Sequence, residues 1–93
     1  MKIIYTFTFN EKIIEIKNYL KVNHPTYLKS TILEINQKAE SLDKNPYIGR
    51  LGKVEGTREL IFTKLPYFII YEIDDNKQEI LILNILHTAM KYP

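Results

Sequence analysis

The residue types that could do chemistry in this 93-residue chain are its basic side chains and two histidines, because it has no cysteine. Without thiolates, neither a disulfide framework nor a cysteine zinc site can form, and two histidines alone give no usual zinc site. We therefore expect no metal and no cofactor. His24 precedes Pro25 and is typical of a surface residue at the start of a helix. His87 ends the last apolar run, where an imidazole could act as a general base.

An arginine and a glutamate, Arg58 and Glu59, stand together at the start of a long apolar stretch, GTRELIFTKLPYFIIY. In a strand, successive side chains point to opposite faces of the sheet. Arg58 would then share a face with Leu60 and Phe62, and Glu59 would share the other with Ile61. The pair is therefore not expected to act as one acid–base dyad.

Basic residues are concentrated between positions 44 and 64, although the net charge of the whole chain is only +2. Such a patch favours an acidic partner, either a protein or a nucleic acid, and a solvated surface loop is the alternative. The segment contains five basic and two acidic residues: Lys44, Arg50, Lys53, Arg58 and Lys64 against Glu55 and Glu59.

Several function classes are excluded by pattern. The chain has no P-loop, dinucleotide-binding glycine motif or nucleophile elbow. Gly49 and Gly56 are interpreted as turn residues that supply a positive φ angle. No apolar run approaches the length of a membrane helix and no signal segment is evident, so we expect one cytoplasmic domain spanning residues 1–93.

The N-terminal half predicts one strand and two helices. Met1–Phe7 is β-branched and aromatic, which favours a strand. Thr6 or Thr8 can cap the helix that follows, and Thr8 has the capping-box spacing to Glu11. The apolar positions of this helix recur at helical spacing, and a second helix begins near Pro25 after a break of about four residues. The two apolar stripes are Phe9, Ile13, Ile16 and Leu20, then Leu28, Ile32, Ile35, Ala39 and Leu42.

The C-terminal half predicts three strands, Thr57–Thr63, Pro66–Ile73 and Gln78–His87, after a loop at Asp43–Gly56. Their short connections indicate an antiparallel meander. The order is β-α-α-β-β-β, an α+β fold with a helical hairpin on one face of a mainly antiparallel sheet. We expect the other face and the tail after the last strand to form the contact surface, and the apolar excess to leave a groove for an amphipathic partner helix.

One ordered set of motifs extends along the chain: Asn45-Pro46, Gly49-Arg50, Gly56-Thr57-Arg58-Glu59-Leu60, Pro66-Tyr67, Tyr71, Ile82-Leu83, Leu86-His87 and Pro93. This order resembles the RelE/ParE superfamily of type II toxins. The resemblance implies a small bacterial toxin that is neutralised by an antitoxin, with DNA contacted only through that antitoxin. RelE-like members cut mRNA on the ribosome without metal, whereas ParE-like members of the plasmid-stabilisation branch are associated with DNA gyrase.

Two cations of the ribonuclease relatives are missing here. Phe68 stands where those relatives carry an arginine after the tyrosine, and His87, Thr88 and Ala89 stand where others carry one at the end of the last strand. Many relatives read leucine-arginine before the final apolar pair and histidine, and this chain has Asn84 there, after Leu83.

The remaining polar residues define two candidate sets. If the protein is a nuclease, the resemblance implies Arg58 and Lys64 on phosphate and His87 or Tyr92 moving protons. If it binds a target, Arg50, Arg58 and Lys91 are the expected contacts. Because the cations are missing, we favour a gyrase-binding growth inhibitor over an mRNA interferase, an endoribonuclease. A third possibility for the protein is a decayed toxin that only binds its antitoxin. For Arg58, the alternative to a functional role is that it only anchors the loop.

Overall fold

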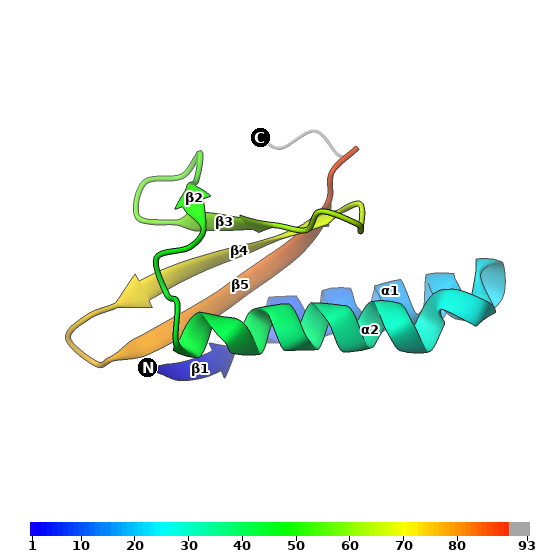
Figure 1. Cartoon of the computed structure of the whole chain (residues 1–93), viewed down its shortest axis with the longest axis horizontal. Coiled ribbons are helices and arrows are strands. Elements are labelled where there is room, and N and C mark those ends of the chain that lie inside the picture. The colour runs from blue at the N-terminus through cyan, green and yellow to red at the C-terminus, as the bar shows by residue number, and fades with distance from the viewer. Residues whose placement is uncertain (90–93) are drawn as a thin grey trace.

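The computed structural model describes residues 1–89 and shows two helices on one face of a five-stranded sheet (Figure 1). The α+β class predicted from the sequence is confirmed, with one more short strand than expected. Among residues 1–89, no helix has the length and apolar content needed to cross a membrane. In chain order the elements are β1 (Lys2–Tyr5), α1 (Phe7–Asn23), α2 (Pro25–Glu40), a 3-10 turn (Ser41–Asp43), β2 (Arg50–Leu51), β3 (Arg58–Ile61), β4 (Tyr67–Asp74) and β5 (Glu79–His87).

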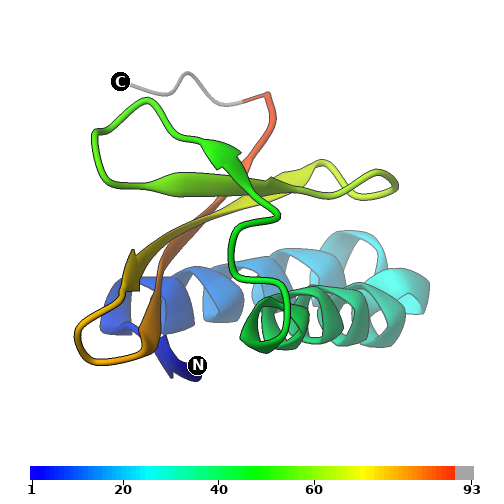
Figure 2. The same ribbon diagram turned by 60° about the vertical axis from the view of Figure 1, so that its left-hand side comes forward.

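The sheet is mixed, with the strand order β1-β5-β4-β3-β2. β5, β4, β3 and β2 pair antiparallel, as the predicted meander requires, while β1 pairs parallel with β5. Parallel neighbours need a crossover connection, which the two helices provide. β1 and β2 therefore lie at opposite edges of the sheet (Figure 2). The segment predicted as a loop, Asp43–Gly56, contains β2.

α1 begins at a cap that also ties it to the sheet. The Thr6 hydroxyl accepts a hydrogen bond from the Phe9 amide at 3.3 Å and donates to the Ile82 carbonyl at 2.7 Å. β1 therefore ends at Tyr5 rather than at Phe7. Of the two predicted caps, Thr6 is correct and the Thr8 capping box is wrong, because Thr8 already lies inside the helix.

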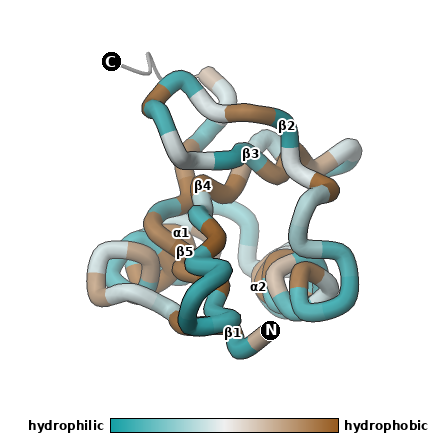
Figure 3. The backbone as a smooth tube through the Cα atoms, turned by 90° about the vertical axis from the view of Figure 1, so that its left-hand side faces the viewer, coloured by the Kyte–Doolittle hydropathy of each residue, from teal (hydrophilic) through white to brown (hydrophobic). Residues whose placement is uncertain are grey.

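The two helices form a hairpin whose apolar stripes face the sheet. Only His24 separates them, because its amide closes α1 on the Leu20 carbonyl at 2.8 Å and Pro25 starts α2. Figure 3 shows both helices end-on, on the same side of β3. The predicted stripe of α1 is buried in full, and most of that of α2 is buried, with Leu28 and Ile32 partly so.

Strand register confirms which side chains share a face. Arg58 pairs with Tyr71, which packs in the core under the helices, while Glu59 pairs with Ile70 on the other face. Arg58 and Glu59 therefore point to opposite faces. β4 is buried on both faces from Tyr67 to Tyr71, as its apolar residues at both parities predict.

A β-bulge in β5 changes the alternation of its side chains. Ile70 pairs with Asn84 but the next residue, Tyr71, pairs with Ile82, so Leu83 is an extra residue in the strand. Because of this insertion, Ile82 and Ile85 both reach the core, although three positions separate them.

Candidate functional site

Arg58 is held against the segment that leads into β2. One terminal nitrogen of its guanidinium donates to the Gly49 carbonyl at 2.7 Å and to the Tyr47 carbonyl at 3.3 Å. The guanidinium also lies 5.2 Å from the centre of the Tyr47 ring, within cation–π range. These contacts match the loop-anchoring alternative weighed from the sequence.

Tyr71 holds the same segment, residues 46–49, from the core side of the sheet. Its hydroxyl accepts a hydrogen bond from the Gly49 amide at 2.9 Å and donates to the Pro46 carbonyl at 2.7 Å. The residue is fully buried, and this burial raises the pKa of Tyr71, so the hydroxyl remains a donor near neutral pH. Position 49 must be glycine because an added Cβ would lie 2.6 Å from the Tyr71 oxygen. The sequence predicted a positive φ angle at both Gly49 and Gly56. The prediction is confirmed for Gly56, whose φ is 85°, and is wrong for Gly49.

Arg50 and Glu59 form an ion pair on the face of the sheet away from the helices. Nε of Arg50 donates to Oε1 of Glu59 at 3.0 Å, and a terminal nitrogen of Arg50 lies 2.9 Å from the same oxygen in the ion pair. Glu59 is only 3% exposed, whereas 67% of the Arg50 side chain is accessible. Within residues 1–89, Oε2 of Glu59 is buried with no hydrogen-bond donor. Sequence reasoning placed Glu59 on this face but did not identify its partner.

His87 is half-buried at the end of β5 and packs edge-on against Tyr67, with ring centres 5.5 Å apart. Its Nδ1 accepts the Ala89 amide at 3.1 Å. In the neutral ring this bond assigns the proton to Nε2, which is then a donor and not a base. Lys64 is exposed in the turn between β3 and β4, which lies at this same end of the sheet.

The structure does not bring Arg58 together with His87, although Lys64 lies at the same end of the sheet as His87. In the sheet register Arg58 pairs with Tyr71 and His87 with Tyr67. Four residues along β4 and two strand spacings therefore separate them, about 13 Å in one direction and about 10 Å in the other. Arg50 lies on the other face. Two further predicted residues, Lys91 and Tyr92, fall outside the described residues.

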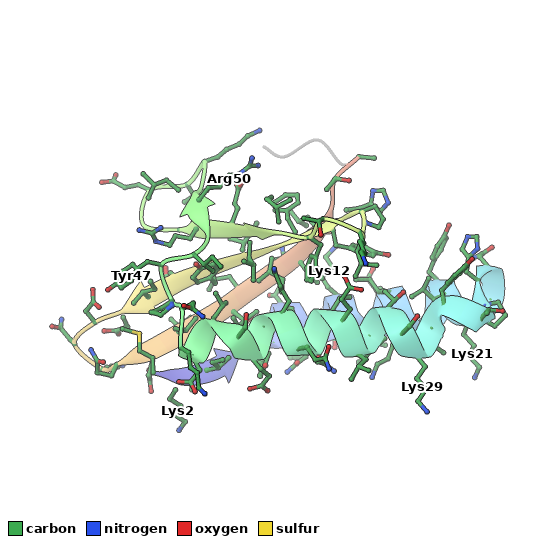
Figure 4. All side chains as sticks on the ribbon, in the orientation of Figure 1. Lys2, Lys12, Lys21, Lys29, Tyr47 and Arg50 are labelled. Carbon is green, nitrogen blue, oxygen red and sulfur yellow. The ribbon has the colours of Figure 1, made fainter. Side chains whose placement is uncertain are left out.

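A groove lies between α1 and the end of the sheet that carries His87. It has a volume of about 620 Å³, and its apolar floor is formed by Ile16, Leu20 and Ile85. Burial, followed by the nearby Tyr19, raises the pKa of Tyr67, so the phenol in its wall stays protonated at neutral pH. Figure 4 shows Lys12 on the sheet side of the helices. The polar and charged residues of the lining are Lys12, Glu15, Tyr19, His24, Thr31, Tyr67 and His87.

The described part of the chain gathers no metal-binding group. No cluster of three or more histidine, cysteine, aspartate or glutamate side chains occurs within residues 1–89. The described residues therefore form three features of interest: an apolar groove, an internal ion pair, and a sheet edge that is basic and partly apolar.

Comparison with known proteins assigns the family. The model of the ParE toxin of the type II toxin–antitoxin system parDE matches residues 3–92. The chain belongs to the ParE toxin family. It is also 27% identical over 92 residues to the provisionally named toxin Y4kP of Sinorhizobium fredii, covering 99% of this toxin and 93% of that protein.

Two solved structures share the fold of this toxin. A structure of the chromosomal ParDE system of P. aeruginosa matches with a TM-score of 0.80 and 22% identity, over 94% of this chain and 95% of that one. The toxin–antitoxin complex RelBE2 of Mycobacterium tuberculosis matches with a TM-score of 0.65 and 21% identity, over 92% and 95%. The resemblance to RelE/ParE toxins that the sequence motifs carry is thus confirmed, and the protein is a type II toxin of that superfamily.

Proposed function

We propose that this toxin stops growth by binding a host protein in the cytoplasm, DNA gyrase in keeping with ParE-like toxins, and that a cognate antitoxin neutralises it. The observation that carries this proposal is the separation of the residues that a nuclease would need. The register places Arg58 and His87 far apart on the sheet.

The contacts of Arg58 and His87 support the same conclusion. The Arg58 guanidinium is occupied by two backbone carbonyls, and Nδ1 of His87 is occupied by a backbone amide. Phe68, at the position where the similar ribonucleases carry an arginine, is 7% exposed in the face away from the helices. Metal-free RNA cleavage needs cations on the phosphate and groups that move protons, and within residues 1–89 Arg58 and His87 do not supply these groups around one point.

The groove beside α1 is the surface that we assign to the antitoxin. An amphipathic helix buries its apolar face in such a groove. The floor is apolar, and the rim carries Lys12 and Glu15, whose charged groups are 3.9 Å apart. The ParDE and RelBE2 structures come from systems that pair a toxin with an antitoxin, which supports a partner of this kind.

The proposal is tested by expressing the toxin in a bacterium that lacks the system. We expect growth arrest with gyrase-dependent DNA damage, no new mRNA ends at ribosomes, and rescue by co-expression of the antitoxin encoded beside the toxin. His87→Ala should still arrest growth, because His87 is not a general base in this account.

Site-specific mRNA cleavage that His87→Ala or Arg58→Ala abolishes would overturn the proposal. Thermal unfolding of each variant must accompany this result, because Arg58 also holds the segment before β2. No growth arrest by the unsubstituted protein would instead indicate a toxin that retains only antitoxin binding.

A further inference from the structure

The edge of the sheet at β2 exposes apolar side chains beside basic ones. Leu51 is 78% exposed, and Tyr47 and Val54 on either side of β2 are 56% and 53% exposed. β2 is the last strand in the sheet order, so its outer side has no neighbouring strand in the described part of the chain (Figures 1 and 2). Large apolar side chains gathered around an unpaired strand mark an interaction surface.

A small hollow lies on the helix side of this edge. Its volume is about 220 Å³, and Tyr47, Leu51 and Ile73 form its apolar wall. Among the described residues that line it, the only charged side chain is Arg58. An apolar side chain entering this hollow would contact Leu51 and Ile73 without meeting a carboxylate.

The other side of the edge presents Arg50. Its guanidinium binds Glu59 through two nitrogens yet stays 67% accessible, so a second carboxylate can approach it from solvent. Oε2 of Glu59 is buried without a donor among the described residues.

The backbone of β2 can accept one extended segment. The Gly52 amide donates to the Thr57 carbonyl at 2.9 Å, toward β3. Because hydrogen-bonding directions alternate along an antiparallel strand, the N–H and C=O groups of Leu51 point outward. A strand of two residues offers few such bonds, so side chains must supply most of the affinity.

We propose that the β2 edge binds the host protein target of this toxin through an extended segment in which apolar and acidic side chains alternate. In such a segment successive side chains point to opposite faces. An apolar side chain then fills the hollow beside Leu51, and the next, acidic, side chain pairs with Arg50 on the other face. The excess of basic residues between positions 44 and 64 complements that acidity.

The toxin has two separate surfaces, the groove beside α1 and the β2 edge, for the two partners named in the proposed function, the antitoxin and the host target. This inference rests on that proposed function. The groove beside α1 has the larger volume, about 620 Å³ against about 220 Å³ for the hollow at β2, and it lies at the end of the sheet that carries Tyr67 and His87. Leu51 pairs with Arg58, which aligns with Tyr71 toward the other end. The β2 edge offers the unpaired side of a strand, which suits an extended segment, so we assign it to the target and the groove to the antitoxin.

The test compares Leu51→Asp with Val22→Asp, an identical change of charge at a position of matched exposure. Val22 is 80% exposed and lies next to Lys21, which Figure 4 places at the far end of the helical hairpin from Arg50. Leu51→Met serves as a conservative replacement that keeps the apolar contact. Each full-length variant is assayed for growth arrest, for binding to purified DNA gyrase and for binding to the cognate antitoxin.

We expect Leu51→Asp to lose growth arrest and to bind gyrase at least about tenfold more weakly, because it removes an apolar contact and repels the acidic segment. Val22→Asp should behave like the unsubstituted toxin, and Leu51→Met should weaken gyrase binding less than Leu51→Asp does. All variants should keep antitoxin binding within about twofold.

Growth arrest by Leu51→Asp equal to that of Val22→Asp would overturn the inference. So would a loss of antitoxin binding confined to Leu51→Asp, which would assign the edge to the antitoxin. Loss of ribosomal mRNA cleavage in Leu51→Asp would make the edge a nucleic-acid surface and refute a protein target. If the unsubstituted toxin causes no arrest, the proposed function itself fails, and this inference fails with it.

Discussion

Replacing Tyr71 with phenylalanine removes one hydroxyl on which the segment before β2 depends. That hydroxyl accepts the Gly49 amide at 2.9 Å and donates to the Pro46 carbonyl at 2.7 Å. Gly49 is buried, so its amide would lose its acceptor at a cost of about 1–3 kcal/mol. The Pro46 carbonyl is only half-buried, so water can replace its donor and it adds less than about 1 kcal/mol. We expect the free energy of unfolding to fall by about 2 kcal/mol, or about 10 °C in Tm for a domain of this size.

The assay is urea unfolding followed by circular dichroism, with Tyr27→Phe as the matched control. Tyr27 is 63% exposed, so the same chemical change there should be nearly neutral. If Tyr71→Phe unfolds within about 0.5 kcal/mol of the control, the hydroxyl does not hold the segment and the reasoning is refuted.

Three further predictions use the same unfolding assay. Gly49→Ala should cost about 1–3 kcal/mol, because the new methyl group would lie 2.6 Å from the Tyr71 oxygen, and an unchanged midpoint would contradict this packing. Arg50→Ala should cost about 3 kcal/mol by leaving the Glu59 carboxylate buried without a partner. Adding Glu59→Leu to Arg50→Ala should restore part of the lost stability. A double variant that loses the sum of the two single-variant losses would argue against a stabilising Arg50–Glu59 pair. Burial, followed by a hydrogen bond to a carboxylate, raises the pKa of Tyr5 from 10.0 to about 12, so the unfolded state loses this proton first. Its contribution to stability should be complete below pH 10 and disappear as the pH rises to about 12, whereas Tyr5→Phe should show a weaker alkaline decline.

The parts of the fold that repeat locally could be predicted from the sequence. Helical spacing identified the buried stripe of α1, and apolar residues at both parities identified β4 as a strand buried on both faces. Strand alternation predicted that Arg58 and Glu59 point to opposite faces, and the register confirms it. These features depend on neighbours along the chain, so their periodicity is visible in the sequence.

The missed features depend on distant contacts or on a single inserted residue. β2 has only two residues and shows no periodicity. The Leu83 bulge shifts the alternation in the middle of an otherwise regular strand. Gly49 appeared to be a turn glycine, but the reason for it is Tyr71, 22 positions away.

The candidate site was predicted only as a set of residue types. The sequence identified Arg50, Arg58, Lys64 and His87 as the groups of interest, but it could not show how they are arranged. Register then placed Arg58 and His87 apart, and backbone contacts occupied both. A list of cations shows which charges are present, but only the register shows whether they converge.

The most direct test of the central claim is a DNA supercoiling assay with purified gyrase, the purified toxin and its antitoxin. The account predicts that the toxin inhibits supercoiling and that stoichiometric antitoxin relieves the inhibition, with Leu51→Asp inactive and His87→Ala active. Full supercoiling activity in the presence of the toxin, together with cleavage of mRNA on ribosomes that His87→Ala abolishes, would contradict it.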